Sequence, residues 1–114
     1  MHALEECSGS TQFGQTFDDW GHHFLVYNAN HIYQEVIANR YLTRNPDQVV
    51  GDATASLSDH GDACDVYPIT KNPEHQLLTD VGVITSACGI TAYQGGAFPD
   101  SFNHNLTFVC EPVS

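Results

Sequence analysis

The sequence predicts an all-β fold with antiparallel sheets, and two observations carry this prediction. Short runs rich in Phe, Val, Ile, Thr and Tyr recur along the chain, and these residue types favour strands. The runs come in neighbouring pairs separated by Gly, Asp and Asn, which favour turns. With 114 residues, the chain can bury one compact core.

The first pair of runs lies on either side of residues 18–21. Asp18 suits the first position of a turn and Gly21 the last, so a β-hairpin is expected here. The second run, residues 24–27, is apolar at four successive positions. Both of its faces should be covered, as in an inner strand.

Residues 31–42 fit two structures. One set of apolar positions fits a helical stripe, and an overlapping set fits one face of a strand, so periodicity leaves both open. The helical set is Ile32, Tyr33, Val36, Ile37 and Tyr41, and the strand set is Ile32, Val36 and Ala38.

The middle of the chain reads as a long inserted loop, residues 43–80, rich in Gly, Asp, Ser, Thr and Pro. A strand-like apolar pattern resumes at residues 81–84, and the runs at 89–93 and 106–110 look like neighbouring strands. The Gly-x-Thr pattern at residues 14–16 recurs at residues 89–91, roughly 75 residues later. A propeller blade repeats every ~40 to 50 residues, so the offset exceeds one blade by about the length of the inserted loop. Two blades, 12–42 and 81–114, with the loop between them fit this offset.

Charge excludes two classes of partner. The chain has 3 Lys and Arg against 14 Asp and Glu, a net charge of −11. This field repels phosphate backbones and anionic lipid headgroups, so neither nucleic acid nor a membrane surface is an expected partner. The longest apolar run, residues 24–27, is too short for a membrane span, and no signal peptide is visible at the N-terminus.

Four cysteines, Cys7, Cys64, Cys88 and Cys110, form no Cys-x-x-Cys motif and no haem attachment site. They allow three disulfide pairings in an oxidising compartment. Buried single thiols are the alternative, since Cys88 and Cys110 lie in apolar runs that look like strands.

Residues 85–99, with a Tyr-x-Gly-x-x-Phe-Pro turn at 93–99 before the Phe-Val strand at 108–109, resemble a blade of glucose/sorbosone dehydrogenase-type propellers. Residues 13–24, 28–32 and 40–46 narrow the resemblance to the membrane-bound dehydrogenases also called PVC-type haem-binding proteins. The resemblance covers about residues 9 to 113.

In that family, an exported bacterial propeller precedes helical repeats and a C-terminal cytochrome c module. The resemblance therefore implies a two-blade fragment whose partner is the rest of the propeller, in the periplasm or cell envelope. It implies a sugar or alcohol substrate, and electrons that pass to haem c in a part absent from this chain. It also favours a strand for residues 31–37.

Such dehydrogenases use a His as general base while hydride passes to pyrroloquinoline quinone (PQQ), with Arg and Asn fixing the quinone and Ca²⁺. The resemblance assigns the base to His31, beside Asn28 and Asn30, and the cofactor-binding cations to Arg40 and Arg44. The chain departs from the pattern of these dehydrogenases at residues 11–14, which are Thr-Gln-Phe-Gly. Related quinoproteins carry Arg-Asn-Pro-x-Gly at this place, so the arginine of that motif is absent here.

Asp59, His60, Asp62 and Asp65 form a candidate metal site, since carboxylate oxygens suit Ca²⁺, although their spacing is not that of an EF-hand. Trp20 can stack on a sugar ring or cap the core. Three functions stay open: a segment of a dehydrogenase, a non-catalytic carbohydrate- or partner-binding propeller, and a small acidic Ca²⁺-binding domain.

Overall fold

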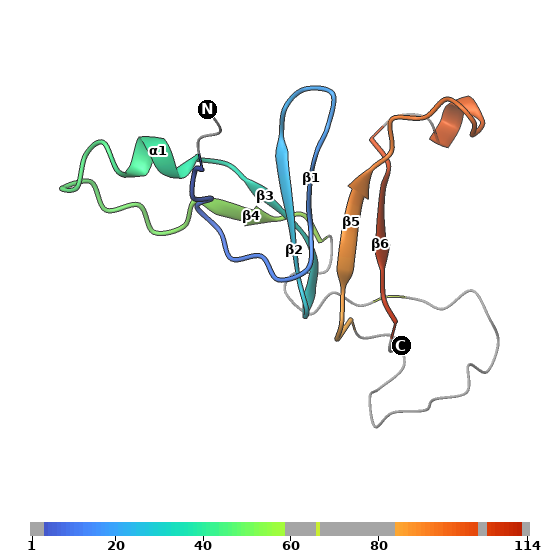
Figure 1. The fold of residues 1–114 in the computed structure, drawn as a ribbon, viewed down its shortest axis with the longest axis horizontal. Helices are drawn as coiled ribbons and strands as arrows, with labels where there is room; N and C mark the ends of the chain where they lie inside the picture. Colours follow the sequence, from blue (N-terminus) through green and yellow to red (C-terminus); the bar gives the residue numbers. More distant parts are fainter. Residues whose placement is uncertain (1–3, 59–65, 67–83, 103–104, 113–114) are drawn as a thin grey trace.

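The part of the chain that the structure describes forms two antiparallel sheets (Figure 1). The computed structural model describes residues 4–58, 66, 84–102 and 105–112. Four strands in the order β1-β2-β3-β4 form the first sheet, and the hairpin β5-β6 forms the second. The all-β prediction is confirmed, and the assignment of propeller blades stays a prediction. The elements are β1 Gln15–Phe17, β2 His23–Tyr27, β3 Asn30–Glu35, α1 Asn39–Leu42, β4 Thr54–Ser56, β5 Cys88–Ala92, the 3-10 helix η2 Asp100–Phe102 and β6 Thr107–Cys110.

The predicted hairpin at residues 18–21 is present as β1-β2. Thr16 lies opposite Phe24, and the Gly21 amide donates to the Asp18 carbonyl at 3.1 Å. Gly21 adopts a φ of 82°, which an L side chain rarely tolerates, so glycine at this position allows the tight turn.

Strand β2 is an inner strand, as its apolar run predicts. It pairs with β1 on one edge and β3 on the other, and Leu25 and Val26 are fully buried. The expectation that both faces are covered fails at Tyr27, which is exposed at the end of the strand. The register with β3 shifts between Leu25 and Tyr27, so the last residue departs from the regular pleat.

Residues 31–42 contain both structures that the periodicity left open. Strand β3 runs to Glu35, and the short helix α1 begins at Asn39. Among the described residues, no helix has the length and apolar character needed to span a membrane.

Strand β4 falls inside residues 43–80, where the sequence predicts only a loop. It has three residues, and Ala55 is its only apolar one, so it carries almost no local signal. Pairing with β3 supplies the partner that makes it a strand, with Ala55 opposite Gln34. The loop prediction is therefore wrong at Thr54–Ser56.

Apolar side chains of both sheets form the core. Val26 of β2 packs with Ile84, Ala87 and Ile90, all buried. Strand β5 lies beside β1 (Figure 1), and the Gly89 amide donates to the Phe13 carbonyl at 2.8 Å. The two sheets are thus joined by hydrogen bonds as well as by burial.

The predicted neighbouring strands at 89–93 and 106–110 are present as β5 and β6. Their register shifts between Cys88 and Thr91, and Gly89 adopts a φ of 64° there. Cys110 is exposed and Cys88 is half-buried, so neither is the buried thiol expected from its apolar context. Cys7, Cys88 and Cys110 are free thiols, and Cys64 lies outside the described residues.

Candidate functional site

A hollow of about 570 Å³ lies between the tip of the β1-β2 hairpin and the β5-β6 hairpin. Its size is within the range of small-molecule sites, ~300 to 1,000 Å³. Phe24, Ile32 and Ala92 contribute apolar surface to its lining. Polar and aromatic side chains surround them: Asp18, Asp19, Trp20, His22, Gln34, Tyr93, Gln94 and Asn105.

Asp18 organises the hairpin tip. Its Oδ1 accepts hydrogen bonds from the amides of Trp20 and His22 at 2.9 and 2.8 Å, and its Oδ2 lies 2.7 Å from His22 Nδ1. Desolvation raises the pKa of Asp18, but hydrogen bonds from His22 and Trp20 outweigh it, and the pKa lies below its ordinary value. The ionised carboxylate therefore fixes the backbone on both sides of Trp20.

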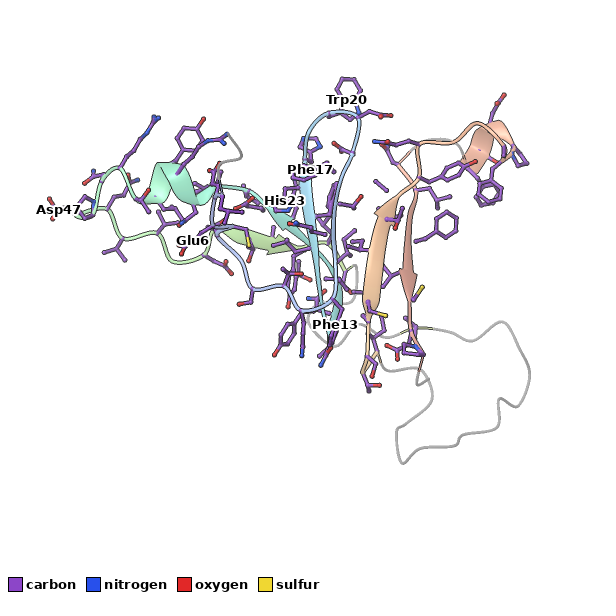
Figure 2. The ribbon with its side chains drawn as sticks, viewed as in Figure 1. Glu6, Phe13, Phe17, Trp20, His23 and Asp47 are labelled. Atoms are coloured by element: carbon purple, nitrogen blue, oxygen red, sulfur yellow. The ribbon has the colours of Figure 1, made fainter. Side chains whose placement is uncertain are left out.

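Trp20 projects from this tip (Figure 2). Its side chain is 82% exposed, so the expectation that it caps the core is wrong. Apolar partners for its ring would have to come from outside the described residues or from a ligand. An exposed indole at the mouth of a hollow offers a flat apolar surface with one N–H donor.

Tyr93 supplies the opposite aromatic wall. Its ring packs against Phe98 and Phe108, with ring centroids 4.8 and 5.9 Å away. Its hydroxyl accepts a hydrogen bond from the Ala97 amide at 2.9 Å. The Tyr93 ring is therefore held in place from two sides.

Side-chain amides complete the polar lining. Gln94 donates to the Phe17 carbonyl at 3.4 Å, which links the two hairpins. The side chains of Gln34 and Asn105 also line the hollow, and neither has a hydrogen-bond partner among the described residues. Amide groups of this kind both donate to and accept from hydroxyls.

The predicted catalytic residues lie elsewhere, around the β2-β3 turn. The Asn30 side chain is buried, where it donates to Ser56 Oγ at 3.0 Å and accepts from the Ile32 amide at 3.2 Å. The Asn28 carbonyl accepts from the Ala87 amide at 3.1 Å. These contacts join β3 to β4 and β2 to the second sheet, which gives both residues a structural role.

His31 is the second residue of β3, directly after Asn30. Its Nδ1 is buried and has no hydrogen-bond partner among the described residues. Burial lowers the pKa of His31, so the ring is neutral at pH 7 and retains a lone pair on one nitrogen. It is not among the residues that line the three described hollows, the largest of about 960 Å³. Asn28 and Asn30 are also absent from the lining of these three hollows.

Arg40 and Arg44 lie around α1 and are not placed with His31. Both guanidinium groups lie over the Tyr41 ring, 5.1 and 5.3 Å from its centroid, and Arg40 also pairs with Glu5 at 3.3 Å. PQQ carries several carboxylates and needs cations directed at one site. The two cations of the described residues, Arg40 and Arg44, are engaged with Tyr41 or Glu5, and PQQ binding stays a prediction.

The predicted metal ligands Asp59, His60, Asp62 and Asp65 lie outside the described residues. Within residues 4–58, 66, 84–102 and 105–112, no three His, Cys, Asp or Glu side chains gather in a way that could hold a metal ion.

A second polar cluster, which the sequence did not reveal, lies on the opposite face of the first sheet. His23 Nδ1 lies 2.6 Å from Glu35 Oε2, and His23 Nε2 lies 2.8 Å from Gln15 Oε1. Glu35 Oε1 accepts from the amide and the hydroxyl of Ser8 at 2.6 and 2.8 Å. Phe17 stacks on the His23 ring with centroids 4.5 Å apart (Figure 2).

This cluster attaches the N-terminal segment to the sheet. Burial raises the pKa of Glu35, but the hydrogen bonds from His23 and Ser8 more than offset it, and the pKa lies below its ordinary value. The polar atoms are mutually satisfied, so the cluster is suited to stabilising the fold. His23 and Glu35 are 12 residues apart and become neighbours only through the β2-β3 register.

Comparison with known protein families gives a match over the length of the chain. The profile of a protein family described as "Domain of unknown function (DUF7133)" matches residues 1–114. No curated protein and no solved structure matches the chain.

Proposed function

The chain belongs to the DUF7133 family over its whole length, and from this premise we propose that it is a segment of the propeller domain of a membrane-associated sugar or alcohol dehydrogenase. In this proposal, the segment contributes a sugar-binding hollow. The observation that carries it is that Trp20, whose side chain is exposed, lines the same hollow as Tyr93, Gln34 and Asn105.

The chemistry of the lining suits a sugar. One face of a pyranose is a row of C–H groups that packs on an aromatic ring, and Trp20 offers such a ring at low cost in side-chain entropy. Its hydroxyls need groups that both donate and accept, which the amides of Gln34 and Asn105 provide. The proposal therefore assigns substrate binding to this segment.

The redox part of the proposal rests on the resemblance of residues 85–99 to propeller blades of quinoprotein dehydrogenases. The quinone, its Ca²⁺ and haem c would be held with the help of other parts of the domain. The same resemblance supports a periplasmic or cell-envelope location. The general-base role of His31 stays a prediction.

The second candidate is a non-catalytic carbohydrate- or partner-binding propeller. The observation in its favour is that the guanidinium groups of Arg40 and Arg44 contact the Tyr41 ring, and that Arg40 also pairs with Glu5. Dye reduction by the full-length gene product with PQQ, Ca²⁺ and a panel of sugars and alcohols separates the two. Reduction that requires both quinone and substrate supports the dehydrogenase, and sugar binding without reduction supports the binding propeller.

Sugar binding can be measured on the 114-residue chain, because Trp20 is its single tryptophan. Titration with glucose and other monosaccharides should give a saturable change in Trp20 fluorescence. By calorimetry, Trp20→Ala should weaken binding at least about tenfold, a loss of about 1.4 kcal/mol. Tyr41→Ala removes an exposed aromatic ring outside the hollow and should leave affinity unchanged. Equal sugar affinity in the unmodified chain, Trp20→Ala and Tyr41→Ala would contradict the proposal.

A further inference from the structure

Cys88 and Cys110 are directly opposed positions of the β5-β6 hairpin. Opposed residues of an antiparallel pair have Cα atoms ~4.5 to 5.5 Å apart. A disulfide spans Cα separations of ~4.4 to 6.8 Å, so this pairing needs no movement of the strands. Both side chains are free thiols, and Cys110 is exposed to solvent.

The glycine bulge in β5 brings the two thiols to the same face. The one-residue register shift between Cys88 and Thr91 includes Gly89, whose φ of 64° suits such a bulge. In a regular strand, Cys88 would share a face with Ile90, which is buried in the core. The extra residue reverses this alternation and places Cys88 on the outer face with Cys110.

Hydrogen bonds hold the open end of this hairpin in register. Glu111, next to Cys110, accepts from the amides of Thr85 and Ser86 at 3.1 and 2.9 Å. On the other side of the cysteines, Thr91 pairs with Phe108. The two thiols are therefore positioned from both sides before any bond forms between them.

We propose that Cys88 and Cys110 are a dithiol modification site that a small-molecule disulfide converts into one cross-strand disulfide. One cysteine thiolate attacks oxidised glutathione and expels a glutathione thiolate, which leaves a mixed disulfide. The other cysteine thiolate then attacks the protein sulfur and expels the second glutathione. Two protein thiols lose two electrons and two protons, and one oxidised glutathione becomes two reduced ones.

The test removes the other two thiols with Cys7→Ser and Cys64→Ser in the full chain. After incubation in an oxidised glutathione buffer and alkylation, mass spectrometry should find the Cys88 and Cys110 peptides linked, without bound glutathione and reversibly by dithiothreitol. The matched control adds Cys88→Ser and Thr91→Cys, which keeps two cysteines but moves one out of the opposed position. It should accumulate glutathione adducts instead.

Thermal unfolding provides a second readout. The oxidised chain should melt at least about 5 °C above the reduced chain, because the bond closes the loop between the hairpin strands. The control should melt at the same temperature in both buffers. Separate glutathione adducts on Cys88 and Cys110, or equal linking in the control, would overturn the proposal.

Discussion

Gly14 and Gly89 meet backbone to backbone where the two sheets touch. A Cβ atom at Gly14 would lie 3.2 Å from the Gly89 nitrogen and 3.3 Å from its Cα. Both glycines have φ values in the region that disfavours L side chains, 149° and 64°. The two glycines that begin the repeated Gly-x-Thr pattern are thus in contact with each other, and this contact lets β5 lie beside β1.

Gly14→Ala should lower the free energy of unfolding by about 1 to 3 kcal/mol, because the added methyl group meets backbone atoms and the φ is strained. Urea denaturation of the 114-residue chain measures the change. Gly51→Ala is the control, since a Cβ there meets nothing within 4 Å. Equal effects of the two substitutions would mean that the sheets do not touch at Gly14.

Ile90→Ala should cost about 2 to 5 kcal/mol, because Ile90 is buried against Val26 and the substitution leaves a cavity between the sheets. The same urea experiment measures it. Val49→Ala removes a comparable side chain that is fully open to solvent, and its effect should stay within about 0.5 kcal/mol. A small loss for Ile90→Ala would show that the second sheet does not pack on the first.

Acid should destabilise the protein through Glu35. Its pKa in the folded chain lies below the ordinary value of 4.5, so its contribution to stability is present above that value. The contribution disappears as the pH falls through the lower folded-state pKa. Glu35→Gln should lower the free energy of unfolding by about 1 to 3 kcal/mol at pH 7, with a smaller difference at lower pH.

The measurement for Glu35 is a series of urea denaturations between neutral and acidic pH. Asp47→Asn is the control, because Asp47 is an exposed carboxylate on the loop after α1 (Figure 2). Its stability curve should follow that of the unmodified chain. A Glu35→Gln curve that runs parallel to it at all pH values would contradict the assignment.

Asp18→Ala should make the Trp20 side chain and the hairpin tip that carries it more mobile. The substitution removes the acceptor of two backbone amides and the partner of His22, so the hairpin tip loses its side-chain hydrogen bonds and keeps only backbone ones. Fluorescence anisotropy of the single tryptophan should fall, and sugar affinity should fall with it. Asp19→Ala changes the neighbouring residue, whose side chain makes no hydrogen bond among the described residues, and should leave the anisotropy unchanged.

Local patterns were enough to predict both hairpins and the inner position of β2. The turn residues Asp18 and Gly21 located the first hairpin, and the apolar run at 24–27 identified β2 as an inner strand. The β-prone runs near Ile90 and Val109 located the second hairpin. In each case, the residues that direct the structure are within a few positions of one another.

The candidate site was only partly visible in the sequence. Trp20 stands out in the sequence as the single tryptophan, in a predicted turn, yet nothing local indicates that it is exposed or that Tyr93 and Asn105 line the same hollow. The pairing of His23 with Glu35 had no signal either, because it depends on the register of β2 against β3. The sequence pattern does not predict strand β4 for the same reason, since its three residues become a strand only beside β3.

The all-β class and the two hairpins can be predicted from residue preferences for turns and strands, which act over short distances, and the net negative charge follows from composition. Three relationships emerge only when the chain is folded: Gly14 meets Gly89, Cys88 lies opposite Cys110, and Trp20 lines the same hollow as Tyr93. These relationships follow from strand register and from the packing of two sheets. A one-residue bulge is enough to change which side chains meet, and no local preference encodes the partner on a distant strand.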